Sequence, residues 1–309
     1  MMADDQPKPR IVGVGAVFID DIVLPTGQTY MAQLGGGVVH ALMGAAIWGE
    51  RPGINAVIGN GLPDEALVRL KNSLDTTGLI RLDIPQIRAW QLFEEDSTRR
   101  ELYRVKDVEP FIRGAQPPDL PTQYHGSQGY YLLQGFDGVR AWCATIKGIV
   151  LWEPLQQIMI PGNRATIRAI LQEFPISIIS PNLQEAEAVY GQKSPTEIIN
   201  AIFDDGARGI ALRMGEQGSI VAQCNSSEHL YIPAVPVKAV VDQTGAGNTY
   251  CGGLLWGLAA RKTLVEAGAA GAVAASFCIE GVGVVNPGVI NFAERDRRYQ
   301  DCIAQMQSL

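Results

Sequence analysis

Short apolar runs alternate with amphipathic segments along most of the chain. Apolar runs rich in β-branched residues predict buried strands at 11–22, 54–58, 130–133, 149–152, 176–179, 210–213, 220–222 and 239–241. Apolar residues at helical spacing predict helices at 38–48, 64–74, 138–146, 162–173, 183–190, 194–204, 247–261, 264–280 and 291–307. Strands and helices that alternate in this way predict an α/β fold with a central, mostly parallel sheet flanked by helices.

The stretch between residues 83 and 105 departs from this pattern. Its runs 87–93 and 101–105 partly alternate between apolar and polar residues and are joined by polar residues, which predicts a β-hairpin. A hairpin inserted into a strand–helix series often forms a lid or a contact between copies. We therefore expect a flexible tail at 1–10 and one α/β domain at 11–309, with a small β lid near 16–34 and 83–105. The proline-containing stretch 114–122 predicts a loop.

The composition limits the classes of partner. The chain has 309 residues, of which 47% are hydrophobic, and its net charge is −7. Because phosphate backbones are bound by clustered Lys and Arg, this charge argues against nucleic acid as the main partner. The longest run of small apolar residues, 267–279, is too short to span a bilayer and predicts a buried helix, so we expect no membrane partner.

The cysteines and the first residues bear on localisation. The five cysteines are widely spaced and form no C-x-x-C pair, which argues against structural zinc and disulfides. The first ten residues are polar and include Asp4 and Asp5, so they do not resemble a signal peptide. We therefore expect a cytoplasmic protein.

A glycine-rich turn follows the predicted strand 239–241. Thr244-Gly245-Ala246-Gly247 precedes a predicted helix that begins near Asn248. Glycines let backbone N–H groups converge, and a helix N-terminus adds about half a positive charge, so this segment predicts a phosphate site. A plain turn between strand and helix is an equally good interpretation of the segment alone, since it is neither a Walker A loop nor a G-x-G-x-x-G motif.

The segment 242–248 resembles the C-terminal signature D-T-x-G-A-G-D of the PfkB (ribokinase-like) family of small-molecule kinases. The resemblance implies that Gly245, Ala246 and Gly247 form an anion hole, with Asp242 and Thr244 on the nucleotide side. The last residue of the signature is the general base in the family, and here that position holds Asn248. Gln243 also replaces the usual Thr.

Two further stretches resemble the nucleotide side of that family. Asn182 and Glu185 match its N-x-x-E motif, which implies that they organise Mg²⁺ and phosphate; a helix N-cap with its capping-box partner is the alternative. Gly215 and Gly218, after the predicted strand ending in Arg213, resemble the G-x-x-G turn beside the nucleotide phosphates. A hairpin turn is the alternative there.

The stretch 35–49 resembles the N-terminal signature of the family. Gly36 and Gly37 match its glycines, whereas His40 replaces the Asn that contacts sugar. Asp20 matches a carboxylate that often binds sugar hydroxyls, although a solvated strand end explains it as well. These residues form the expected substrate side.

Several other polar and aromatic residues are open to more than one interpretation. Glu153 follows a predicted strand, where open α/β sheets place ligands, and a structural role is as good an interpretation. On the predicted hairpin, Arg99, Arg100 and Arg104 are interpreted as contacts to an anionic substrate or as solvated charges. Trp90 and Phe93 are interpreted as lid core or as a wall of the substrate site. We expect His125 and His229 to be surface residues.

The resemblance implies MgATP-dependent phosphorylation of a hydroxyl on a sugar, nucleoside or related small molecule, and it leaves room for a monovalent cation. Asn248 opens alternatives, because a neutral amide does not accept a proton as a carboxylate does, and general-base help is worth about 10²–10⁴-fold. In an active kinase, another carboxylate, such as Asp20, Asp242 or Glu153, can help the hydroxyl, or Asn248 can merely orient it. Otherwise the protein is a pseudokinase that binds a nucleotide or small ligand as a regulatory or assembly protein, or an enzyme that releases phosphate. A lid sheet with open edges also suggests a homodimer, which sedimentation velocity would test.

Overall fold

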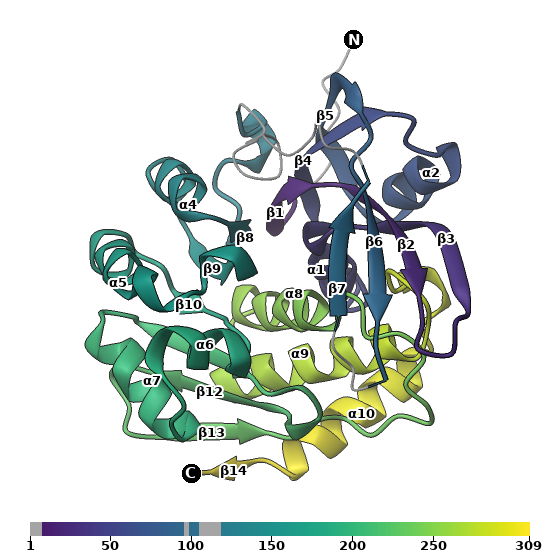
Figure 1. Cartoon of the computed structure of the whole chain (residues 1–309). Coiled ribbons are helices and arrows are strands. Elements are labelled where there is room, and N and C mark those ends of the chain that lie inside the picture. The colour runs from purple at the N-terminus through teal and green to yellow at the C-terminus, as the bar shows by residue number, and fades with distance from the viewer. Residues whose placement is uncertain (1–7, 96–98, 105–118) are drawn as a thin grey trace.

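The computed structural model describes residues 8–95, 99–104 and 119–309. Its larger sheet has ten strands in the order β14-β13-β12-β11-β10-β9-β8-β1-β4-β5 (Figure 1). These strands are β14 Gln307–Ser308, β13 His229–Ile232, β12 Ser219–Gln223, β11 Gly209–Arg213, β10 Ile178–Ile179, β9 Ile149–Pro154, β8 Gly129–Gln134, β1 Ile11–Ala16, β4 Gly53–Asn60 and β5 Asp75–Pro85. The strands from β11 to β5 pair in parallel, and β12, β13 and β14 add antiparallel at one edge.

Helices cover both faces of this sheet. They are α1 Gly37–Ala46, α2 Asp64–Ser73, α4 Phe136–Cys143, α5 Arg164–Glu173, α6 Leu183–Tyr190, α7 Pro195–Asp204, α8 Ala246–Ala259, α9 Leu264–Ile279 and α10 Phe292–Ala304. Side chains of alternate strand residues enter two separate cores, since successive residues of a strand point to opposite faces. Tyr131 joins the core of α1, α8 and α9, and its neighbour Tyr130 joins the core of α4 to α7. The predicted fold class is confirmed.

A second sheet of four strands stands apart from the first, in the order β3-β2-β6-β7. It consists of β3 Thr29–Gly35, β2 Phe18–Val23, β6 Arg88–Phe93 and β7 Arg99–Tyr103. Strands β6 and β7 form the predicted antiparallel hairpin, and β2 runs parallel to β6. We call this four-stranded sheet the lid sheet. Because it does not merge with the main sheet, its edge strands β3 and β7 remain candidates for the homodimer, which stays a prediction.

A buried carboxylate holds the strands of the lid sheet together. Asp21 accepts hydrogen bonds from the guanidinium groups of Arg88 and Arg104 and from the backbone N–H of Ala32. Burial opposes its ionisation, but these donors outweigh it and lower the pKa of Asp21 to about 2. The three donors lie on or beside β6, β7 and β3, so one charged side chain on β2 fixes all four strands.

One amide joins the lid sheet to the main sheet. The side chain of Gln86, buried between β5 and β6, accepts a hydrogen bond from Gly59 N and donates one to Val17 O. Its backbone N–H donates to Asn60 O. Three parts of the chain therefore meet at Gln86, namely the carboxyl end of β4, the link from β1 to β2 and the link from β5 to β6.

The structure corrects several details of the predicted elements. The expected strand 11–22 is two strands, β1 and β2, which separate at Val17 and enter different sheets. Residues 239–241 form no strand; Val240 is 54% exposed, and Val241 N bonds the end of α9 instead. The strands β5, β13 and β14 were not predicted.

Some predictions concern side chains and loops. His125 is exposed as expected, but His229 is only 7% exposed in β13, so the prediction of a surface residue there was wrong. Part of the predicted loop 114–122 lies outside the described residues. Of the described helices, none combines the length and the apolar character that crossing a bilayer requires.

Candidate active site

Several of the candidate residues meet at the carboxyl edge of the main sheet. Glu153 lies near the end of β9, Arg213 ends β11, and Asn182 precedes α6 directly after β10. The glycine turn 244–247 and the first turn of α8 lie beside them, since Gly247 approaches Arg213. Open α/β sheets bind ligands at this edge, because the strands end there and the helices that follow present their N-termini.

The two glycines of the turn are packed so closely that no side chain fits at their positions. Gly245 has a left-handed backbone with φ of 71°, and a Cβ there would lie 2.0 Å from Nδ1 of His40. A Cβ on Gly247 would lie 2.0 Å from Nη1 of Arg213. The two glycines therefore let the start of α8 lie against the Arg213 guanidinium, and a helix N-terminus beside a cation favours an anion at this position.

Asp242 shapes this turn. Its Oδ1 accepts a hydrogen bond from Thr244 N at 2.9 Å, and its Oδ2 accepts one from Gly283 N at 2.8 Å. The side chains of Asp242 and Thr244 are both buried. Since both carboxylate oxygens of Asp242 are engaged, the structure gives this residue an organising role. Direct nucleotide contact by Asp242 and Thr244 stays a prediction.

Arg213 is the centre of a buried charge cluster. Its Nη1 lies 2.8 Å from Oε1 of Glu153, its Nη2 donates to Ser180 O at 2.8 Å, and Oε2 of Glu185 lies 3.8 Å from Nη2. Its side chain is only 12% exposed. Burial disfavours the cation, but Glu153 and other neighbours outweigh it and raise the pKa of Arg213, so the guanidinium stays charged.

The N-x-x-E segment forms a helix cap and also faces this cluster. Asn182 Oδ1 accepts from Glu185 N, and Glu185 Oε2 accepts from Asn182 N, both at 2.8 Å. The capping-box interpretation is therefore correct. Burial raises the pKa of Glu185, and Arg213 acts against that rise. A carboxylate that is partly desolvated beside a phosphate site suits Mg²⁺, which prefers oxygen ligands; its role as a metal ligand stays a prediction.

The G-x-x-G turn follows Arg213 directly and joins β11 to β12. Gly215 and Gly218 both have positive φ, 62° and 81°. Gly218 O accepts from Met214 N, and Gly218 N donates to Gly215 O, which closes a tight turn. The hairpin-turn interpretation is therefore correct, and the nucleotide role of this turn stays a prediction.

Asn248 links the glycine turn to strands β8 and β9. Its Nδ2 donates to Oη of Tyr131 at 3.2 Å, and that hydroxyl donates to Oε2 of Glu153 at 2.6 Å. A Cβ on Gly37 would lie 3.0 Å from Asn248 Nδ2, so the start of α1 also approaches this side chain. Gly36, the residue before Gly37, has a φ of 98°. The structure thus brings Gly36, Gly37 and Asn248 together.

Asp20 lies on strand β2 of the lid sheet, close to the start of α1. It is 3% exposed, accepts a hydrogen bond from Gln91 Nε2 at 3.1 Å, and packs against Gly35. Burial raises the pKa of Asp20 to about 7, and the negative charges of Glu101 and Asp242 add to the rise. A carboxyl group that titrates near neutral pH can either accept or donate a hydrogen bond to a ligand hydroxyl. Its contact with substrate stays a prediction.

Asp20 makes stability depend on pH. Its folded pKa exceeds the ordinary value of 3.8, so the folded state binds more protons between about pH 4 and pH 7, and stability falls as the pH rises through that window. Replacing Asp20 by Asn removes this penalty. At about 1.4 kcal/mol per tenfold change in proton affinity, we expect a gain of at most about 4 kcal/mol at pH 8 and little at pH 4. Urea unfolding at both pH values measures it. Asp137→Asn, at an exposed carboxylate, is the control, and an equal effect at both pH values would contradict the prediction.

His40 is a buried wall of the glycine turn. It is 1% exposed, and its ring packs against Gly245. Burial lowers the pKa of His40 to about 3, so the ring is neutral at physiological pH. The resemblance implies that His40 lies on the substrate side. The ring packs against Gly245, and its contact with an acceptor stays a prediction.

The hairpin arginines have different surroundings. Arg104 is bound to Asp21 and lies 4.7 Å from the ring of Trp90, and Arg100 pairs weakly with Glu94. Arg99, paired in register with Phe93, lies close enough to Asp20 and Glu185 to influence their pKa. Of these three arginines, Arg99 is the one whose charge lowers the pKa of both Asp20 and Glu185.

Sequence reasoning missed Tyr131, Gln91 and Ser180. Tyr131 lies within an apolar strand, so its residue type suggested only core packing. Gln91 Nε2 also donates to Glu101 Oε1 at 2.8 Å, and Tyr103 donates to Glu101 Oε2 at 3.0 Å. These lid residues form a polar row beside Asp20. The alternation of polar side chains along β6 and β7 was the available signal.

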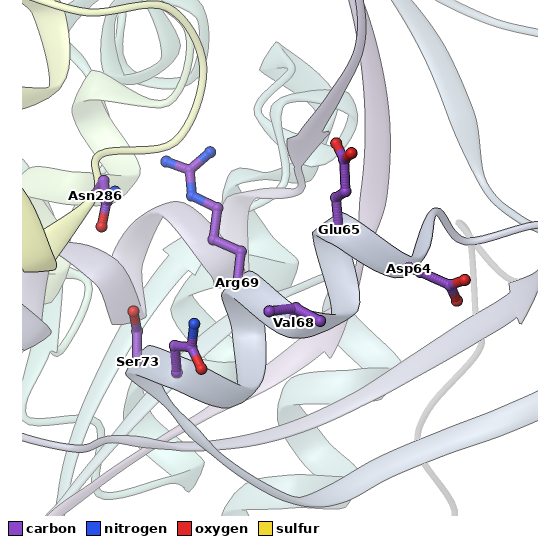
Figure 2. A pocket seen from close by; sticks show the side chains of 7 residues that line it. Asp64, Glu65, Val68, Arg69, Ser73 and Asn286 are labelled. Atoms are coloured by element: carbon purple, nitrogen blue, oxygen red, sulfur yellow. The ribbon is translucent and has the colours of Figure 1, made fainter.

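A cavity of about 350 Å³ lies elsewhere, at α2. Its lining includes Asp64, Arg69 and Asn286, and Figure 2 shows the acidic side chains pointing away from one another. Arg69 donates a hydrogen bond to Val284 O. No glycine turn or converging set of charges lies among its lining residues, so the edge cluster is the better candidate active site.

The same segments match a family of kinases, and two curated proteins are similar over most of the chain. Residues 161–290, which hold Asn182, Glu185, Arg213 and the glycine turn, match the pfkB family of carbohydrate kinases. Protein MAK32 of Saccharomyces cerevisiae is 30% identical over 316 residues, covering 90% of this chain and 86% of that protein. A cytidine kinase of Thermococcus kodakarensis is 25% identical over 266 residues, covering 83% of this chain and 91% of that protein.

A solved structure agrees over nearly the whole length. Ribokinase of Arabidopsis thaliana, complexed with ribose and ATP, has a TM-score of 0.71 at 16% identity, covering 94% of this chain and 99% of that one. This likeness shows the shared fold, including the lid sheet beside a large mostly parallel sheet. Sequence and fold together place the chain in the pfkB family of carbohydrate kinases.

Proposed function

We propose that this protein transfers the γ-phosphoryl group of MgATP to a hydroxyl of a sugar, nucleoside or related small molecule. One observation carries the proposal: the glycine turn lies against the buried Arg213 guanidinium, and Asn248, which follows the turn, lies close to Gly37. Phosphoryl transfer depends mainly on positioning and on electrostatic stabilisation, and both are built into this arrangement.

The proposal assigns the nucleotide to one side of the cluster and the acceptor to the other. On the nucleotide side, the first turn of α8 and Arg213 offer positive charge to the transferred phosphoryl group, and the G-x-x-G turn borders the other phosphates. Glu185 is the metal ligand in this proposal. On the acceptor side, Asp20, Gly36 and Gly37 hold the hydroxyl-bearing molecule under the lid sheet. The names of the relatives, a cytidine kinase and a ribokinase, support both acceptor classes.

Binding of MgATP tests the nucleotide side. Calorimetry with ATP and Mg²⁺ should give saturable binding, and Glu185→Gln should weaken the Mg²⁺-dependent part of it by about tenfold, because a carboxylate ligand is lost. Glu187→Gln is the matched control, since it removes the same charge from the same helix. No binding by the unmodified protein would rule out the kinase, and an equal loss in both variants would rule out Glu185 as the ligand.

Turnover tests the acceptor side. A panel of sugars and nucleosides should include one that increases ADP formation above the level with MgATP alone. The competing function is a pseudokinase that binds nucleotide or a small ligand as a regulatory or assembly protein, which the neutral Asn248 favours. Tight nucleotide binding without turnover on any acceptor would support that second function.

Two conditions belong to the same proposal. Turnover in potassium compared with tetramethylammonium salts tests a monovalent-cation requirement, and equal rates would exclude one.

The five cysteines are all free, four of them buried, which supports a reducing cytoplasm. Localisation of the tagged protein in its native cell checks the compartment.

A further inference from the structure

The hydrogen bonds around Asn248 determine which way its side-chain amide faces. The Tyr131 hydroxyl has one proton, and Oε2 of Glu153 lies 2.6 Å away, a short distance typical of donation to a carboxylate. Having donated that proton, the hydroxyl accepts a hydrogen bond from its other neighbour. The amide atom 3.2 Å away must therefore be the Asn248 nitrogen, which leaves Oδ1 for a ligand.

The carboxylate at the far end keeps this direction fixed. Glu153 Oε1 is paired with Arg213 at 2.8 Å, and Arg213 is itself anchored on Ser180 O. Both oxygens of Glu153 are thus engaged, so the residue is in no position to act as a base or to bind a metal. A second anchor comes from burial, which raises the pKa of the Tyr131 hydroxyl well above its ordinary value and keeps its proton in place.

We propose that Tyr131 and Glu153 are positioning residues that hold Asn248 with its amide oxygen exposed, as a hydrogen-bond acceptor for the acceptor hydroxyl. The catalytic meaning of this orientation rests on the proposed kinase function, whereas the orientation itself does not. Asn248 then aligns the hydroxyl without removing its proton, and the acceptor oxygen keeps a lone pair directed at the phosphate site.

The transfer step balances without a protein base. The acceptor oxygen forms a bond to the γ-phosphorus, and the bond from that phosphorus to the bridging oxygen breaks. ADP leaves with the electron pair. The hydroxyl proton moves to an oxygen of the transferred phosphoryl group, because the amide oxygen is too weak a base to keep it. The loose transition state of such reactions tolerates a late proton transfer.

The orientation can be measured without any substrate. In ¹H–¹⁵N spectra, we expect a side-chain NH₂ proton of Asn248, assigned by its loss in Asn248→Asp, to exchange with water at least about tenfold more slowly than those of exposed asparagines. Tyr131→Phe should abolish this protection. Tyr130→Phe is the matched control, because its hydroxyl donates to Tyr124 O on the opposite face of β8. Protection that survives Tyr131→Phe would overturn the orientation.

A second variant tests the direction of the chain. Glu153→Gln keeps the shape, and Arg213 would take the remaining oxygen, so the new NH₂ would face Tyr131. The hydroxyl would then accept from that NH₂ and donate to Asn248, turning the amide around. We expect the Asn248 NH₂ protection to disappear. Retained protection would contradict the proposed role of Glu153.

Kinetics connects the orientation with function. On an acceptor that the protein phosphorylates, Tyr131→Phe should lower kcat by about tenfold, while the Kd for MgATP stays within about twofold, since the nucleotide side is untouched. Tyr130→Phe should leave both unchanged. An unchanged kcat in Tyr131→Phe overturns the positioning role. A protected amide in a protein that turns over no acceptor instead rejects the kinase function and leaves the orientation standing.

Discussion

Replacing Gly247 by Ala should reduce turnover by about 10³-fold, the range seen when donors to a transition-state anion are lost. The new methyl group would lie 2.0 Å from Nη1 of Arg213, and that guanidinium is held by Glu153, Ser180 O and Glu185. Displacing it disturbs a buried ion pair, so we also expect a loss of roughly 3 kcal/mol in the free energy of unfolding. Steady-state kinetics and urea unfolding measure the two effects.

Two further variants separate the steric clash from general damage. Gly162→Ala adds the same methyl group where nothing lies within 4 Å, so turnover and stability should stay unchanged. Arg213→Met removes the group that Gly247→Ala would strike. If the clash is the cause, adding Gly247→Ala to Arg213→Met should cost little more stability. Fully additive losses of stability would show that Arg213 is not what the methyl group disturbs.

Replacing Asn248 by Asp should raise kcat by about 10²-fold, at the low end of what general-base help supplies. The change is isosteric and places a carboxylate at the end of the glycine turn, where the resemblance to the D-T-x-G-A-G-D signature implies one. The gain is limited because the new carboxylate would face the Tyr131 hydroxyl, whose proton already serves Glu153. The nearby negative charge should raise the pKa of the new carboxyl above its usual range, so the gain should grow with pH.

A pH profile of kcat tests this expectation. Asn248→Asp should add a limb that rises with pH, whereas the unmodified protein should lack it. Asn248→Ala is the control, because it removes the amide without adding a base, and it should lower kcat. If Asn248→Asp binds MgATP normally but shows no gain at any pH, the acceptor hydroxyl does not lie beside residue 248.

The alternation of strands and helices was predictable because it depends on local burial, which the sequence records. The partner of each strand was not. The apolar character of 11–22 continues through Val17, where the chain passes from one sheet to the other, so the pattern showed one strand instead of two. The strand β5 was missed because it is an edge strand, half exposed along its length. Residues 239–241 are apolar yet exposed, and periodicity alone does not separate such a loop from a strand.

In the candidate site, too, local features were predictable and long-range contacts were not. The glycine turn and the Asn182–Glu185 cap were predictable, because turns and caps are local chemistry. The Tyr131 hydroxyl was not, since its partner Asn248 is 117 residues away in the sequence. Likewise, nothing in the sequence indicated that His40 would be buried behind Gly245, or that both oxygens of Glu153 and of Asp242 would be engaged. Of the three carboxylates considered as substitute bases, these contacts leave Asp20 as the remaining candidate.

The hydrogen bonds of Gln86 also bear on the proposed acceptor site. One side chain and its own backbone N–H tie the end of β4 to the two links that enter the lid sheet, so they set the angle at which the lid stands over the main sheet. Gln86 is none of the residues assigned to the site. In the proposed kinase, a substitution of Gln86 would therefore change the width of the acceptor site and leave the phosphate site unchanged. Substitutions at position 86 would then let the same fold accept molecules of different size.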